Sequence, residues 1–253
     1  MSLKAVFFDF GGTIDLYPIV KGNAMKAAES MMVILKRAGV DLTDRFSSEE
    51  FNILLNERLG TYKNWKKKTL IELSGEQVWK EYILHDEPQI SNLNAESAEA
   101  LTLLVETGRF TRTVRPEMKD TMEQLSRTGL YFGIISNVLS LTQVPINLIE
   151  YGLEAYFSSV TLSSVFGRVK PHKSIFLHAA EKAGFLPEEC LYVGNSPSKD
   201  ITGAKNAGFL GAVQIEYVDD SEDTTDAGME PDFHIKSMRE LPDIIRHYQM
   251  VRD

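Results

Sequence analysis

Close to its N-terminus the chain carries the run Ala5-Val6-Phe7-Phe8-Asp9-Phe10-Gly11-Gly12-Thr13. Its first four residues are apolar, as is typical of a strand covered on both faces in a parallel sheet. Asp9 follows at the carboxyl end of that strand, where parallel sheets bind their ligands. Gly11 and Gly12 let backbone N–H groups approach a ligand closely, and such groups readily hold a phosphate. We therefore expect a carboxylate beside an anion-binding turn, although an ordinary strand-to-loop turn has the same pattern.

The composition narrows the class of protein. The chain has 253 residues, of which 43% are hydrophobic and 25% charged, as in an ordinary soluble globular protein. It has neither a long unbroken apolar stretch nor a signal-peptide pattern, so we expect a cytoplasmic protein without a membrane partner. Its single cysteine, Cys190, excludes an internal disulfide and a cysteine metal cluster.

The charge is informative about partners. A net charge of -9 argues against binding to nucleic acid or to an anionic membrane, because both favour clustered Lys and Arg. A small anionic substrate is compatible with this charge if a local cation, such as a metal ion held by carboxylates, accompanies it. The sequence leaves the oligomeric state open.

The pattern after Thr13 divides the chain into two parts. Residues 16–112 have helical periodicity, with helices expected at 23–37, from a capping box at Ser47 and Glu50, at 62–84 and at 94–107. Beyond that part, helices alternate with apolar strands expected at 130–135, near 160, at 190–193, at 211–215 and at 233–235. Such alternation indicates parallel β-α units. We predict an α/β fold: a Rossmann-like parallel sheet core of residues 1–15 and 113–253, with an inserted all-helical cap domain of residues 16–112.

Three further segments place polar groups near strand ends or helix starts. Ser136 and Asn137 follow an apolar strand, so the serine hydroxyl and the next backbone N–H could hold a phosphoryl oxygen, or cap a helix. Lys170 stands before a helix, where it could neutralise a carboxylate and a phosphate. Ser196 suits a helix N-cap, which puts Asp200 on the first turn as an outer metal ligand or as an acceptor for Lys170.

Together, in this order, these segments resemble the motifs of the haloacid dehalogenase-like (HAD) hydrolase superfamily, in its phosphatase-like branch with a helical cap after the first motif. Asp9, Ser136 and Lys170 match the first three motifs. The fourth is similar to the segment Gly194-Asn195-Ser196-Pro197-Ser198-Lys199-Asp200-Ile201, followed by Gly203-Ala204 and Ala207-Gly208. The resemblance covers almost the whole chain.

The resemblance implies a magnesium-dependent phosphatase that acts on a small phosphorylated metabolite. Asp9 would attack phosphorus and form an aspartyl phosphate, which water then hydrolyses. Ser136, the Asn137 amide and Lys170 would bind the phosphoryl group beside the turn of Gly11 and Gly12. Mg²⁺ would be held by the Asp9 carboxylate, the Gly11 carbonyl, the Asn195 side chain and waters, with Asp200 in the same acidic segment.

Two departures from the family pattern leave alternatives open. Family phosphatases usually carry an acid/base aspartate where this chain has Gly11. Asp15 is the nearest carboxylate in sequence that could replace it, but Asp15 could equally be a solvated residue at the junction with the cap. Asn195 stands where the family usually has a metal-binding aspartate, so metal affinity should fall. These departures keep a noncatalytic phosphate-binding or regulatory role open.

Other chemistries of the family match less well. Its dehalogenases have a tyrosine at the position of Gly11, and its phosphonatases have an alanine there with a Schiff-base lysine in the cap. A basic cluster in the expected cap could supply such a lysine, so the phosphonatase interpretation stays open. The same cluster is also typical of a solvated face. Its members are Lys63, Lys66, Lys67 and Lys68.

Overall fold

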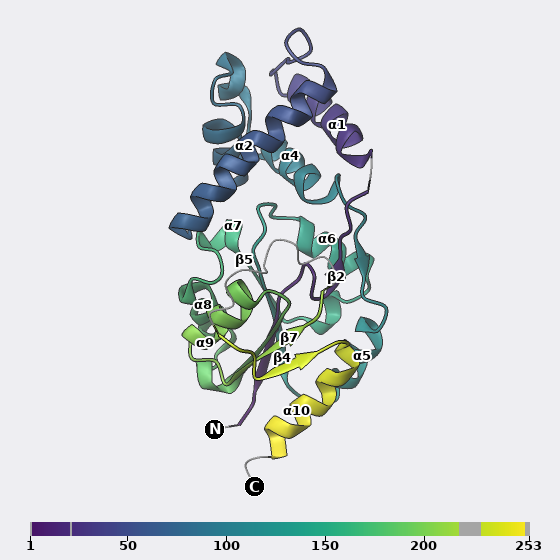
Figure 1. Ribbon diagram of the computed structural model, residues 1–253, viewed down its shortest axis with the longest axis vertical. Coiled ribbons are helices and arrows are strands. Elements are labelled where there is room, and N and C mark those ends of the chain that lie inside the picture. The colour runs from purple at the N-terminus through teal and green to yellow at the C-terminus, as the bar shows by residue number, and fades with distance from the viewer. Residues whose placement is uncertain (1, 21, 218–228, 251–253) are drawn as a thin grey trace.

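The computed structural model describes residues 2–20, 22–217 and 229–250 (Figure 1). One parallel sheet has the strand order β5-β4-β1-β6-β7-β8. Its strands are β1 (Ala5–Phe8), β4 (Tyr131–Ser136), β5 (Ser159–Leu162), β6 (Cys190–Gly194), β7 (Gly211–Ile215) and β8 (Phe233–Ile235). The predicted α/β class with a Rossmann-like parallel sheet is therefore confirmed.

Helices bury both faces of this sheet. Val6 and Phe8 of β1 pack into one core with α5 (Met118–Ser126), α6 (Gln143–Glu150) and α10 (Leu241–Met250). Ala5 and Phe7 pack into another with α8 (Lys173–Ala183) and α9 (Thr202–Asn206). Successive side chains of a strand point to opposite faces, so a continuous apolar run is what this central strand requires. The other elements of this part are α7 (Ser163–Phe166) and the short turns η3 (Glu154–Tyr156), η4 (Pro187–Glu189), η5 (Pro197–Ile201) and η6 (Met238–Glu240).

Residues 23–107 form a helical module, which lies at one end of the molecule, beyond the sheet (Figure 1). It has a hydrophobic core of its own, built around Trp79, Tyr62 and Phe51. The chain enters and leaves it beside a two-stranded antiparallel ribbon, β2 (Asp15–Leu16) with β3 (Thr113–Val114). Its elements are α1 (Asn23–Arg37), α2 (Ser48–Thr69), α3 (Gly75–Val78), η1 (Trp79–Ile83), η2 (Pro88–Asn92) and α4 (Ala95–Thr107).

The expected helix boundaries agree at some places and not at others. The helix expected at 23–37 and the capping box of Ser47 and Glu50 are both present. The range 62–84 is mostly helical as expected, but it is interrupted: α2 ends at Thr69, where Leu70 adopts a left-handed conformation with φ 55. Ser74 then starts α3 with a capping box of its own. Local backbone geometry and capping override the hydrophobic periodicity here.

The carboxyl ends of β1, β4 and β6 lie at the edge of the sheet that faces the helical module (Figure 1). Asp9, Asn137 and Asn195 directly follow these three strands. No described helix is both long enough and apolar enough to cross a membrane.

Candidate active site

Lys170 joins two carboxylates at the centre of the site. Its Nζ donates to Asp9 Oδ1 at 2.6 Å and to Asp200 Oδ1 at 2.7 Å. All three side chains are buried. Asp9 is held by the end of β1, where its backbone N–H donates to the Val193 carbonyl at 2.9 Å. Asp200 lies on η5 behind its N-cap Ser196, as the sequence predicts.

Burial and charge shift the proton affinities of this cluster. Burial raises the pKa of Asp9 to about 6, even though the Lys170 ammonium opposes that rise. Burial acts to lower the pKa of Lys170, but the charges of Asp200 and Asp9 outweigh it, and this pKa lies above its ordinary value. Lys170 is therefore a fixed cation at neutral pH.

Two polar side chains orient Lys170. The Tyr192 hydroxyl accepts from Lys170 Nζ at 2.9 Å and lies 3.2 Å from Asp200 Oδ1. The Asn137 side chain accepts the backbone N–H of Lys170 at 2.8 Å and donates to its carbonyl at 3.0 Å. Asn137 thus clamps the backbone of Lys170, in addition to the phosphate-binding role expected of its own N–H.

The turn after Asp9 is tightly built. Gly12 has φ +81, and a Cβ there would lie 2.7 Å from Asn195 Nδ2, so only glycine fits this position. Arg115 holds the turn from across the chain, donating to the Gly12 carbonyl at 2.6 Å and to the Thr13 carbonyl at 2.9 Å. The turn is therefore a fixed support for the Asp9 carboxylate.

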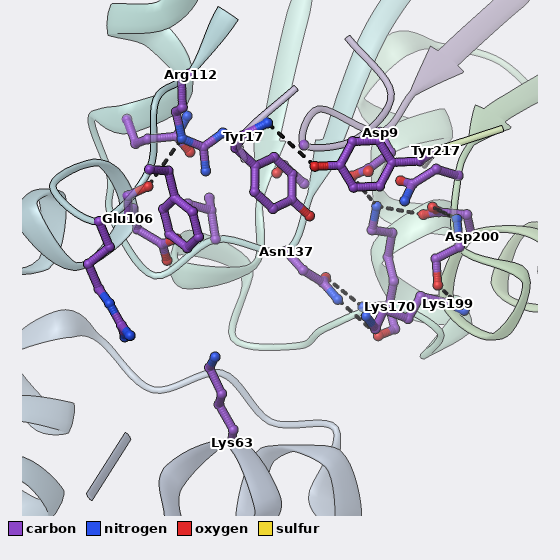
Figure 2. A pocket seen from close by; sticks show the side chains of 18 of the residues that line it. Asp9, Tyr17, Lys63, Glu106, Arg112, Asn137, Lys170, Lys199, Asp200 and Tyr217 are labelled. Carbon is purple, nitrogen blue, oxygen red and sulfur yellow. Dashed lines mark hydrogen bonds and ion pairs between the residues drawn. The ribbon is translucent and has the colours of Figure 1, made fainter. Parts of the chain in front are cut away.

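A cavity of about 450 Å³ opens over this cluster, and Figure 2 shows the side chains that surround it. Of the residues predicted from the sequence it brings together Asp9, Gly11, Ser136, Asn137, Lys170, Asn195 and Asp200. Gly12 does not line the cavity; it packs beneath it, against Asn195. Residues that lie far apart in the sequence thus surround one space large enough for a small metabolite.

The walls of the cavity are cationic, although the chain is acidic. Among the described residues that line it there are three carboxylates, Asp9, Glu106 and Asp200. Against them stand five cationic side chains, namely Lys63, Arg109, Arg112, Lys170 and Lys199. Lys63 lies on α2, so the helical module contributes to the lining (Figure 2). Such a site suits an anionic ligand.

Two side chains considered in the sequence analysis lie elsewhere. Asp15 does not line the cavity: its Oδ2 accepts from Arg112 at 2.8 Å and from the Tyr151 hydroxyl at 3.2 Å. Lys66 pairs with the buried Glu72 at 3.1 Å. Of the four lysines of the basic cluster, only Lys63 lines the cavity.

The donor set for a metal ion is sparse. Within the described ranges, no group of three or more His, Cys, Asp or Glu side chains could hold a metal. Asp200 is occupied by protein donors, since its Oδ2 accepts the Ser196 N–H at 2.9 Å and its Oδ1 accepts from Lys170. Asp9 Oδ2 and Asn195 Oδ1 lie 3.4 Å and 3.2 Å from the same Thr13 hydroxyl, so these two oxygens converge. An all-oxygen pair of this kind fits Mg²⁺, with little negative charge to hold it.

Several residues at the site are not indicated by the sequence pattern. Tyr192 was visible only as a strand residue, and Arg115 only as a residue before a proline. Tyr17 lines the cavity, and burial together with the Asp9 charge raises its pKa above the ordinary value. No local pattern distinguishes these side chains, because their contacts lie far away in the sequence.

Comparisons with known proteins agree with this architecture. The model of the haloacid dehalogenase-like hydrolase family matches residues 3–208. The glyceraldehyde 3-phosphate phosphatase of Methanopyrus kandleri is 37% identical over 133 residues, which are 52% of this chain and 56% of that protein. The chain thus spans little more than half the length of this relative. The enzyme of the same name from Methanothermobacter thermautotrophicus is 29% identical over 207 residues, 82% of this chain and 83% of that protein.

Solved structures show the same fold. A HAD phosphatase from Thermococcus onnurineus aligns with a TM-score of 0.60 and 26% identity, over 96% of this chain and 98% of that one. A 2-haloacid dehalogenase from Pseudomonas syringae aligns with a TM-score of 0.62 and 22% identity, over 97% of this chain and 99% of that one. The family model spans most of the chain, and the ordered motifs surround one cavity. The chain therefore belongs to the haloacid dehalogenase-like hydrolase family.

Proposed function

We propose that this protein is a magnesium-dependent phosphatase that hydrolyses a small phosphate monoester through an aspartyl phosphate on Asp9. The observation that carries the proposal is the Lys170 ammonium, held 2.6 Å from Asp9 Oδ1 in a cation-lined cavity. The phosphatases among the similar proteins support the same reaction.

Each step has a residue suited to it. Asp9 attacks phosphorus. The hydrogen bond from Lys170 fixes its carboxylate at the cavity for this step. Lys170 neutralises charge on the phosphoryl group, while the Ser136 hydroxyl and the Asn137 N–H hold its oxygens. Water then cleaves the phosphoaspartate and releases inorganic phosphate. Asp200 and Tyr192 keep Lys170 aimed at Asp9 throughout.

Mg²⁺, when bound, supplies positive charge to the phosphoryl oxygens. Its protein ligands would be the Asp9 carboxylate, the Asn195 amide oxygen and the Gly11 carbonyl, with Asp200 acting through Lys170. Because Asn195 contributes no charge, we expect activity to need a higher magnesium concentration than a site with an aspartate there.

The helical module acts as the cap of this site in our proposal, with its domain comprising residues 16–112. Lys63 and Arg109 of this part of the chain line the same cavity as Asp9, so in this proposal they meet the part of the substrate that is not transferred. A substrate with a second anionic group would satisfy both. The protein would thus act on a small phosphorylated metabolite in the cytoplasm.

A noncatalytic phosphate-binding role is the second candidate, and Gly11 is the observation that favours it. With glycine at this position there is no carboxylate to protonate a leaving group. Such a protein would bind phosphate in the same cavity without turnover.

A panel of phosphate esters, assayed with Mg²⁺ and with excess chelator, separates the two candidates. A phosphatase releases phosphate only with Mg²⁺, and the Asp9→Asn variant retains the fold and loses turnover. Full activity of Asp9→Asn, or full activity in chelator, would show that the chemistry lies elsewhere. Phosphate binding without turnover of any ester would support the noncatalytic role.

A further inference from the structure

A tyrosine ring covers the position from which a carboxylate is missing. A Cβ built on Gly11 would lie 3.0 Å from Cε1 of Tyr17 and 3.8 Å from its Cζ, the carbon that bears the hydroxyl. With Cδ1 at 3.6 Å, the contact is made by the Cδ1–Cε1 edge of the ring. Tyr17 thus occupies the space that a side chain at position 11 would need.

Three neighbours fix the orientation of this ring. Phe110 packs against it edge-on with centroids 5.6 Å apart, and Tyr217 stacks on it at 5.5 Å. The Arg112 guanidinium lies over it, 5.0 Å from the centroid. A ring held on several sides has few rotamers to lose when a ligand binds, so its hydroxyl is preorganised.

The hydroxyl of Tyr17 points into the cavity. Figure 2 shows it directed toward the open space above Asn137, on the same side as the Asp9 and Lys170 cluster. Among the described residues it has no hydrogen-bond partner. A phenol in its neutral form offers one O–H donor, and this donor is available to a ligand.

We infer that Tyr17 takes the place of the absent carboxylate, donating a hydrogen bond to the leaving-group oxygen of the phosphate ester. This inference rests on the proposed phosphatase activity. An Asp9 oxygen forms the new bond to phosphorus, and the ester P–O bond breaks with its electron pair going to the departing oxygen. Tyr17 O–H stabilises that charge as it develops, and solvent water supplies the proton of the released alcohol.

The test is the dependence of turnover on the leaving group in Tyr17→Phe. This variant keeps the ring and its packing and removes only the donor. Because a hydrogen bond to a charged oxygen contributes about tenfold or more, kcat/KM for alkyl phosphates should fall by at least about tenfold. Turnover of 4-nitrophenyl phosphate, whose leaving group needs little stabilisation, should fall far less. Tyr131→Phe, which removes a hydroxyl at the start of β4 away from the cavity, should change neither.

The outcomes separate this inference from the proposed function. If the wild-type chain releases phosphate from esters, and Tyr17→Phe lowers alkyl and aryl turnover equally or not at all, the inference is overturned while the phosphatase stands. If the wild-type chain hydrolyses no ester, the proposed function fails and the inference fails with it.

A second pair of variants tests the same geometry. Gly11→Asp alone should not raise alkyl-phosphate turnover, because its side chain would meet the clamped ring of Tyr17. The double variant Gly11→Asp/Tyr17→Ala makes room for the carboxylate and should raise that turnover above Tyr17→Ala. A gain in Gly11→Asp alone, equal to that of the double variant, would show that Tyr17 does not occupy the position of the acid.

Discussion

Asp15 and Arg112 form a buried ion pair at the junction of the sheet core and the helical module. The Asp15 side chain is fully buried, and Arg112 retains only 10% of its side-chain exposure. Burial raises the pKa of Asp15, while the nearby Arg112 charge opposes the rise. Its Oδ2 is held by Arg112 and Tyr151 and the residue does not line the cavity, so this carboxylate serves the structure rather than the site.

Removal of Arg112 should destabilise the protein in a pH-dependent way. Arg112→Met leaves the Asp15 charge unpaired, and breaking such a pair costs about 3 kcal/mol of the free energy of unfolding at pH 7. The pKa of Asp15 in the folded variant rises further above its unfolded value, so the cost should shrink as the pH falls through that raised pKa. Urea unfolding at pH 7 and pH 5 measures it. Arg112→Met/Asp15→Asn, which removes both charges, should recover much of the loss; equal losses at both pH values would contradict this account.

At the residue scale the sequence predicts only part of the site. Asp9 and Ser136 could be placed at one sheet edge because each ends an apolar strand, and Lys170 because it precedes a helix. Tyr17 and Arg115 could not, because their contacts depend on tertiary packing: Arg115 reaches the Gly12 carbonyl across 103 positions of sequence. The catalytic and metal-binding roles assigned to the site remain predictions.

At the scale of elements, a carboxylate from one helix caps another. Glu99 of α4 accepts from the Ser140 hydroxyl at 2.6 Å, from the Thr142 hydroxyl at 2.7 Å and from the Thr142 N–H at 3.0 Å. The first turn of α6 carries no acidic residue of its own. The helical module thus satisfies orphan N–H groups of a helix in the core, which joins the two parts.

Neutralising this carboxylate should loosen the contact. Glu99→Gln keeps the size of the side chain but removes the charge, and it should lower the free energy of unfolding by about 1–2 kcal/mol. Chemical denaturation measures the loss. Glu57→Gln, which neutralises an exposed carboxylate in the middle of α2, is the control and should change stability little. Equal effects of the two substitutions would show that Glu99 makes no special contribution.

The sequence predicts element boundaries where capping residues mark them. It does not predict a boundary that depends on the backbone conformation of a single residue. The capping residue Ser47 marks the start of α2. The helix ends before Leu70, which has a left-handed conformation, inside a stretch with helical periodicity. A leucine gives no local signal for such a break. The Leu70 carbonyl accepts the Val169 N–H at 3.2 Å, a contact that no local sequence pattern could predict.

At the scale of the whole molecule, the charge of the cavity opposes that of the chain. The net charge is -9, yet five cationic side chains line the cavity, Lys63 and Arg109 among them. Lys63→Ala should raise KM for esters that carry a carboxylate besides the phosphate by several-fold, since one ion contact is lost. It should leave KM for esters without a second anion nearly unchanged.

Steady-state kinetics on matched ester pairs measure this difference. Lys68→Ala, on the same helix but outside the cavity lining, is the control. An equal change in KM for both kinds of ester would mean that Lys63 contributes only to the overall electrostatic potential of the cavity and makes no specific contact with a second anionic group. That result would remove the argument for a second anionic group on the substrate.

The central claim is that Asp9 carries the phosphoryl group during turnover. The direct measurement is to quench the protein during hydrolysis of a rapidly cleaved aryl phosphate, reduce it with borohydride, and sequence its peptides by mass spectrometry. Borohydride converts an acyl phosphate of aspartate to homoserine, and we expect homoserine at position 9 and at no other aspartate, with none in Asp9→Asn. Phosphate release without any modification at position 9, or with modification at another aspartate, would contradict the account.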